Sequence, residues 1–176
     1  MTNKFLFAGF GGQGILFAGK LLAYKGLTDG KEVSWLPSYG PEMRGGTASC
    51  SVILSDTPVG SPIVSNPDIL IAMNLPSLDK YESTVAEGGM IFYDSSLIGR
   101  EVVRGDVKAF PIPATKMAEE NGTPTLANMI IMGKVLKETG DFTEESVRTA
   151  LTKVISAKRA DMLDVNYGAI KLGFDF

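Results

Sequence analysis

Short apolar runs alternate with amphipathic stretches through the first half of the chain, and helix-like stretches dominate its last third. Apolar runs bounded by turn residues are typical of buried strands, and apolar positions recurring every three or four residues are typical of helices. The pattern predicts strands over residues 4–8, 31–36, 47–54, 68–73, 90–93 and 107–112. It predicts helices over residues 14–27, 75–86, 114–120, 126–138, 143–155 and 161–172.

This order of elements predicts an α/β fold. Strands that alternate with helices favour a three-layer α/β/α arrangement with a parallel or mixed sheet. The length of 176 residues suits one domain, so we expect residues 1–176 to form a single domain. Gly30 is expected to end the first helix and Pro37 to close the second strand.

A glycine-rich turn separates the first strand from the first helix. It contains Gly9, Gly11, Gly12, Gln13 and Gly14. Glycine is required where φ is positive or where a Cβ would collide with a ligand or a packed helix. The helix that follows begins with free N–H groups, which favour an anion such as a phosphate. We therefore expect backbone to approach a ligand or another chain here.

The letters of this turn also match the dinucleotide fingerprint G-x-G-x-x-G. That fingerprint needs an acidic residue at the end of the second strand to bind the ribose. The nearest acids, Asp29 and Glu32, precede that strand or begin it. Nucleotide binding by this chain alone is therefore the weaker interpretation. A third interpretation is that the glycines only permit close packing of helix and strand.

The composition of residues 38–46 predicts a second loop, which carries polar and charged side chains. Tyr39, Glu42 and Arg44 provide a ring hydroxyl, an anion and a cation, and Pro41 stiffens the segment. An arginine suits bidentate recognition of a carboxylate or phosphate. The alternative is an ion pair between Glu42 and Arg44 on a solvent-exposed turn, which contributes little to stability. Both loops are expected at the carboxyl edge of the sheet, where ligands of such folds bind.

Two further residues have polar or reactive side chains in apolar surroundings. Asn128 lies within an apolar helical run, and a buried asparagine needs hydrogen-bond partners. It is expected either to fix a nearby loop or to face another chain. Cys50 is expected to be a small core residue rather than a reactive thiol.

Composition excludes several classes of function. A net charge of −3 and a pI near 5.0 give no overall basic field to attract nucleic acid, and no apolar run is long enough to span a membrane. A single cysteine excludes an internal disulfide, and we expect a cytoplasmic protein. The chain has no histidine, and one cysteine cannot hold an iron–sulfur cluster. We assign no catalytic or metal-ligating residue, and expect a partner in a larger assembly.

Residues 7–14 resemble the Gly-x-Gly-Gly-Gln-Gly opening of the γ subunit of 2-oxoacid:ferredoxin oxidoreductases, and residues 35–48 are similar to that family's second signature. Residues 67–74, 88–89 and 127–129, together with Gly133, also fall where the family has them. The resemblance extends over residues 4–172. Within the family, the second signature looks most like the 2-oxoglutarate branch.

The resemblance implies the fold of the pyruvate:ferredoxin oxidoreductase γ domain and membership of a hetero-oligomer. Enzymes of this family decarboxylate a 2-oxoacid on thiamine diphosphate, reduce ferredoxin through iron–sulfur clusters and form an acyl-coenzyme A. The implied partners are catalytic α and β subunits that hold thiamine diphosphate, a ferredoxin-like subunit and ferredoxin. The γ subunit would carry no cofactor and would frame the approach of coenzyme A, with the glycine turn, Tyr39, Glu42 and Arg44 at that site or at a subunit interface. Whether the isolated chain is dimeric stays open.

Overall fold

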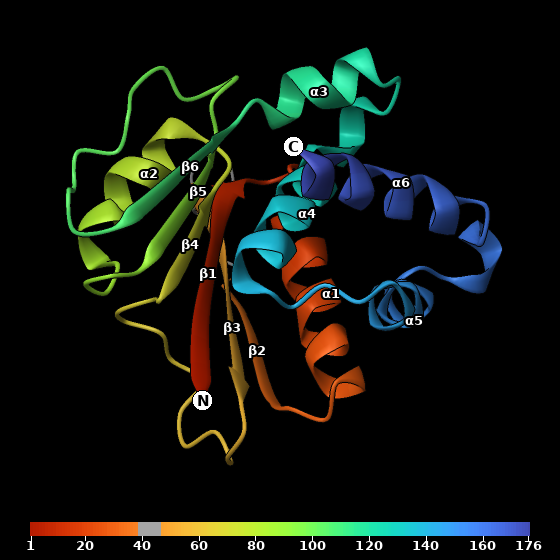
Figure 1. Cartoon of the computed structure of the whole chain (residues 1–176), viewed down its shortest axis with the longest axis horizontal. Coiled ribbons are helices and arrows are strands. Elements are labelled where there is room, and N and C mark those ends of the chain that lie inside the picture. Colours follow the sequence, from red (N-terminus) through yellow and green to blue (C-terminus); the bar gives the residue numbers. More distant parts are fainter. Residues whose placement is uncertain (39–46) are drawn as a thin grey trace.

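The computed structural model describes residues 1–38 and 47–176, and the predicted alternation of strands and helices is present (Figure 1). The strands are β1 (Thr2–Phe10), β2 (Glu32–Ser38), β3 (Thr47–Ser55), β4 (Ile69–Ala72), β5 (Met90–Asp94) and β6 (Lys108–Ile112). The α-helices are α1 (Ile15–Thr28), α2 (Leu75–Tyr81), α3 (Ala114–Glu120), α4 (Ala127–Thr139), α5 (Glu144–Val154) and α6 (Met162–Asp175). Short 3₁₀ helices cover Glu82–Thr84, Pro124–Leu126 and Ala157–Arg159. All six predicted strands and all six predicted helices are confirmed, with ends shifted by a few residues.

The six strands form one mixed sheet in the order β2-β3-β1-β4-β5-β6. Strands β1, β4, β5 and β6 are parallel, whereas β3 is antiparallel to both of its neighbours. Since β3 lies between β1 and β2, those two strands point the same way. Their carboxyl ends therefore share one edge of the sheet, as the sequence predicted, and the register places Ser38 of β2 and Ala8 of β1 both opposite Ser49.

Helices cover the two faces of the sheet unequally. Figure 1 shows α1, α4, α5 and α6 gathered on one side and α2 on the other. The larger apolar core lies under the first group and includes Phe5, Phe7, Leu22 and Met129. A smaller core, which includes Leu70 and Leu78, lies under α2. The expected α/β/α layering is thus confirmed, with most of the apolar burial on one face.

Two boundaries differ from the sequence prediction for physical reasons. Strand β2 continues through Pro37, which lies opposite Cys50, because β2 is an edge strand and the missing N–H costs no central ladder hydrogen bond. The helix expected over residues 75–86 changes to a 3₁₀ turn after Tyr81. The Thr84 hydroxyl donates to the Tyr81 carbonyl at 2.7 Å, which stabilises this tighter ending.

Helices α4 and α6 approach each other through glycine. Gly133 of α4 lies against the carbonyl of Ile170, and Gly173 of α6 lies against the carbonyl of Ile130. A Cβ on either glycine would be closer than 2 Å to that carbonyl oxygen. The absence of two side chains therefore sets the distance between the two helix backbones.

The cysteine is a core residue, as expected. Cys50 is fully buried in β3, and burial raises the pKa of its thiol to about 12. Because the thiolate is the reactive form, alkylation at pH 7.5 should be about a thousandfold slower in the folded chain than in the urea-unfolded chain. Iodoacetamide labelling followed by intact mass measures both rates. Comparable rates in the two states would contradict this placement.

Candidate functional site

The glycine turn, residues 9–14, begins in the last two residues of β1 and leads directly into α1. Gly12 and Gly14 have φ angles of 93° and 72°, in the left-handed region that favours glycine. Gly9 lies in the last part of β1, where a Cβ would be 2.7 Å from the Gln13 side chain and 3.0 Å from Met73. The sequence prediction that glycine is structurally required here is confirmed at these three positions.

Gln13 is turned inward and fixes the turn to the sheet. Its Oε1 accepts a hydrogen bond from the Phe10 backbone N–H at 2.7 Å and from the Asn74 amide at 3.3 Å. Its Nε2 donates to the Met73 carbonyl at 3.0 Å. These bonds join the carboxyl ends of β1 and β4, so within this structure the Gln13 side chain acts as a brace.

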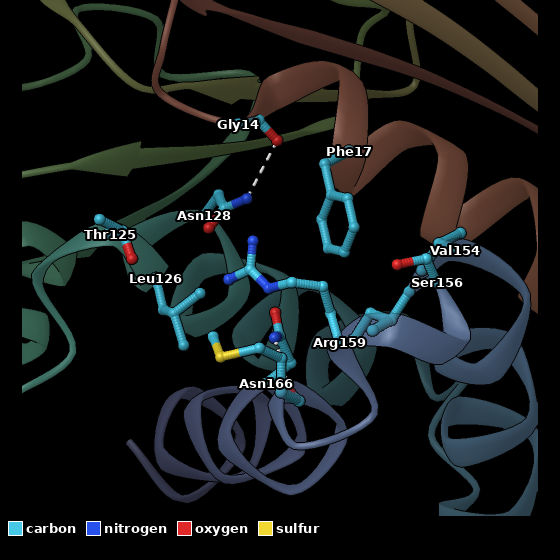
Figure 2. A pocket seen from close by; sticks show the side chains of 11 residues that line it. Gly14, Phe17, Thr125, Leu126, Asn128, Val154, Ser156, Arg159 and Asn166 are labelled. Carbon is cyan, nitrogen blue, oxygen red and sulfur yellow. Dashed lines mark hydrogen bonds between the residues drawn. The ribbon is translucent and has the colours of Figure 1, made fainter.

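Asn128 of α4 holds the other end of the glycine turn. Its Nδ2 donates to the Gly14 carbonyl at 3.0 Å (Figure 2). Its Oδ1 accepts from the Met129 backbone N–H at 2.9 Å. The side chain is buried. Of the two roles that the sequence left open for Asn128, the structure shows the fixing of a loop within this chain.

The amino end of α1 is open to an anion. Gly14 is its N-cap and has no side chain that could cap the helix, and no acidic residue lies in the first turn. The first N–H groups of an α-helix lack intrahelical acceptors and carry partial positive charge. A cavity of about 300 Å³ lies over this end, with Phe10, Gly12 and Leu16 in its wall.

A second cavity adjoins the same helix end and was not foreseen from the sequence. It has a volume of about 430 Å³ and lies between α1, α4 and the start of α6 (Figure 2). Phe17, Leu126 and Met162 supply apolar surface, and Asn128 and Arg159 supply polar groups. We call it the Arg159 cavity. Its sequence signal was faint: a basic pair at residues 158–159 between two predicted helices.

The second predicted loop falls where the structure gives no description. Tyr39, Glu42 and Arg44 lie outside the described residues. Ser38, the last residue of β2, lies at the sheet edge that also carries the glycine turn. The roles of these three residues therefore remain predictions.

The acids considered for a dinucleotide site lie far from this edge. Glu32 begins β2 and faces Ser55 at the opposite edge of the sheet. Asp29 follows the last turn of α1 and accepts a hydrogen bond from the buried Lys25 ammonium at 2.5 Å. Neither could bind a ribose beside the glycine turn.

Large apolar side chains are exposed along the carboxyl edge. Phe10, Leu36, Leu75 and Leu97 lie within three residues of the carboxyl ends of β1, β2, β4 and β5, and each is between 38% and 47% exposed. We call these four residues the apolar row; several exposed large apolar side chains at one edge favour a protein-binding surface. In the described part of the chain, no helix is long and apolar enough to cross a membrane.

The described fold is an α/β domain in which the two candidate ribose-binding acids, Asp29 and Glu32, lie away from the glycine turn, unlike those of a dinucleotide-binding domain. The chain belongs to the pyruvate ferredoxin/flavodoxin oxidoreductase family, whose sequence pattern matches residues 4–176. This confirms the family resemblance seen in the glycine turn and the second signature.

Two relatives and one solved structure of this family are similar to the chain over most of its length. The chain is 43% identical over 171 residues to ketoisovalerate oxidoreductase subunit VorA from Methanothermobacter thermautotrophicus, covering 96% of this chain and 35% of that protein. It is 37% identical over 154 residues to 2-oxoglutarate synthase subunit KorC from Methanocaldococcus jannaschii, covering 86% and 82%. The γ subunit of a keto/oxoacid ferredoxin oxidoreductase from Geobacter sulfurreducens superposes with a TM-score of 0.83 at 28% identity, covering 98% and 96%. The chain thus corresponds to nearly all of a γ subunit and spans about a third of the VorA relatives.

Proposed function

We propose that this chain is the γ subunit, or the γ domain of a longer protein, of a 2-oxoacid:ferredoxin oxidoreductase. The assembled enzyme would convert a 2-oxoacid and coenzyme A to acyl-coenzyme A and CO₂, with two electrons passed to ferredoxin. The observation that carries this proposal is the match to a γ subunit over nearly the full length of both chains. It favours this interpretation over a stand-alone dinucleotide-binding domain.

The composition of the chain supports a non-catalytic role within that enzyme. It has no histidine, and its single cysteine is buried. Four thiolates usually bind an iron–sulfur cluster, so thiamine diphosphate chemistry and electron transfer would belong to the partner α, β and ferredoxin-like subunits. The isolated chain should then be inactive with 2-oxoacids.

The carboxyl edge is the surface we propose for contact with the catalytic subunits. Its exposed apolar row gives an interface core, and the open amino end of α1 lies at the same edge. Coenzyme A would approach between the glycine turn and the partner, with its phosphates toward the α1 N–H groups. Tyr39, Glu42 and Arg44 would complete this wall.

For the substrate, we retain 2-oxoglutarate, which the second signature suggests and the name of the KorC relative supports. A branched-chain 2-oxoacid is the second candidate, because identity to the ketoisovalerate subunit is 43%. Activity of the assembled enzyme with 2-oxoglutarate and with 3-methyl-2-oxobutanoate separates the two.

Substitution of the apolar row tests the assembly. Leu75→Asp and Leu97→Asp should each weaken association with co-expressed catalytic subunits by about tenfold or more, since a charge would replace a buried apolar contact. Leu27→Asp is the matched control: Leu27 is 56% exposed near the carboxyl end of α1, away from the glycine turn, and should assemble normally. Affinity pull-down followed by size-exclusion chromatography measures assembly.

Two results would count against the proposal. One is co-purification of the chain from its native source without thiamine- or cluster-binding proteins. The other is tight binding of NAD to the purified chain, which would favour the dinucleotide-binding alternative. Equal assembly of all three aspartate variants would overturn the choice of interface but leave the enzyme assignment standing.

A further inference from the structure

Strand β2 leaves one edge of the sheet open. Among the described strands its only neighbour is β3, so one row of its backbone groups faces away from the sheet. Trp35 and Leu36, in the middle of this strand, are 38% and 41% exposed. An open edge strand pairs readily with a strand of another chain unless charges, prolines or a short length prevent it.

The two edges of the sheet differ in how they are protected against such pairing. The opposite edge strand, β6, has five residues, begins with Lys108 and contains Pro111. Strand β2 has seven residues, with its one charged residue, Glu32, at the start and Pro37 next to the end. The stretch between them, residues 33–36, has neither a charge nor a proline. Strand β2 is therefore the edge that favours an added strand.

The position of Pro37 indicates which backbone groups of β2 are available. Pro37 lies opposite Cys50 in a ladder that continues to Ser38, so its ring nitrogen faces away from β3. Residues two positions apart on a strand direct their backbone groups to the same side. Val33 and Trp35 therefore direct both N–H and C=O groups outward, whereas Pro37 directs only a C=O.

The side chains of β2 are compatible with a second copy of the same strand. Val33 and Trp35 lie on the α1 face, because a Cβ on Gly26 would be 3.1 Å from the Val33 Cγ2 and one on Gly19 would be 3.4 Å from the Trp35 Nε1. Ser34 and Leu36 consequently lie on the other face. Residues 33–38 carry no charge on either face, so the strand can meet its own copy without like charges lying opposite each other.

We propose that β2 pairs antiparallel with β2 of a second copy of this chain, around a two-fold axis at Trp35. In this register the two Trp35 residues exchange both backbone hydrogen bonds, and the Val33 N–H donates to the Pro37 carbonyl of the copy. Glu32 lies opposite Ser38 of the copy, and the two half-exposed indoles are side by side across the axis. Two six-stranded sheets become one continuous sheet. The proposal does not depend on the proposed function.

Sedimentation velocity of the 176-residue chain over a range of concentrations tests the pairing. A reversible equilibrium between monomer and dimer is expected. Ser34→Lys should weaken dimerisation about tenfold or more, because two new ammonium groups would flank the two-fold axis. Ala109→Lys is the matched control, because Ala109 is exposed on the other edge strand, β6, and its variant should dimerise as the unchanged chain does. Circular dichroism confirms that both variants are folded.

Hydrogen exchange of the unchanged chain locates the contact without any substitution. The amides of Val33 and Trp35 should exchange several-fold more slowly as the concentration, and with it the dimer fraction, rises. The amides of β6 should exchange at the same rate throughout. A dimer that leaves the Val33 and Trp35 amides unprotected would be formed through another surface, such as the apolar row, and would overturn the proposal.

The remaining outcomes separate this proposal from the proposed function. A chain that is still monomeric at about 0.1 mM overturns the pairing, even if the chain assembles into an active oxidoreductase. Protection of the β2 amides that appears only when catalytic subunits are added assigns this edge to a strand of those subunits, and likewise overturns the pairing with a second copy. A dimer that protects β2 in a chain that never joins catalytic subunits supports the pairing and contradicts the proposed function alone.

Discussion

Gly133→Ala and Gly173→Ala should each lower the free energy of unfolding by about 3 kcal/mol, because the added methyl group has no space between the two helices. The added Cβ would lie 1.9 Å from the Ile170 carbonyl oxygen in the first case and 1.7 Å from the Ile130 carbonyl oxygen in the second. Both oxygens belong to helix backbone, so no rotamer change relieves the overlap and the helices must separate. Urea unfolding followed by far-ultraviolet circular dichroism measures the change.

Gly168→Ala is the matched control in the same helix α6. Gly168 is exposed, and a Cβ there meets no atom within 4 Å. Alanine should therefore raise stability by up to about 1 kcal/mol through helix propensity alone. Similar losses at all three glycines would contradict close α4–α6 packing.

Gly14→Ala should cost about 3 kcal/mol for a different pair of reasons. The φ of 72° is unfavourable for alanine by about 1–2 kcal/mol. The new Cβ would also lie 2.3 Å from the Asn128 Nδ2, so Asn128 must give up its bond to the Gly14 carbonyl. A buried polar group without its partner costs about 1–3 kcal/mol.

Gly12→Ala separates these two contributions. Gly12 also has positive φ, but a Cβ there would meet no described atom within 4 Å, so only the backbone cost of about 1–2 kcal/mol should appear. The double variant Gly14→Ala/Asn128→Ala should lose less stability than the two single changes summed, because the collision has been removed. Equal losses for Gly12→Ala and Gly14→Ala, with strict additivity in the double variant, would exclude the proposed role of Asn128.

The glycine turn shows how far sequence reasoning extends. Clustered glycines between an apolar run and a helical pattern predicted positive φ and an open helix end, because both are local properties of the backbone. The inward direction of Gln13 was not predictable. It depends on Met73 and Asn74, about 60 residues along the chain, which the parallel pairing of β1 with β4 brings close.

The sequence by itself determined the order of strands and helices, the need for glycine at the turn and the lack of histidine and cluster-forming cysteines. These follow from periodicity, local conformation and composition, which need no knowledge of distant neighbours. Only the tertiary structure decided that β3 runs antiparallel between β1 and β2, that α4 and α6 meet at two glycines, and that Arg159 faces the amino end of α1. Each of these depends on contacts between residues far apart in the chain, and such contacts leave no periodic pattern in the sequence.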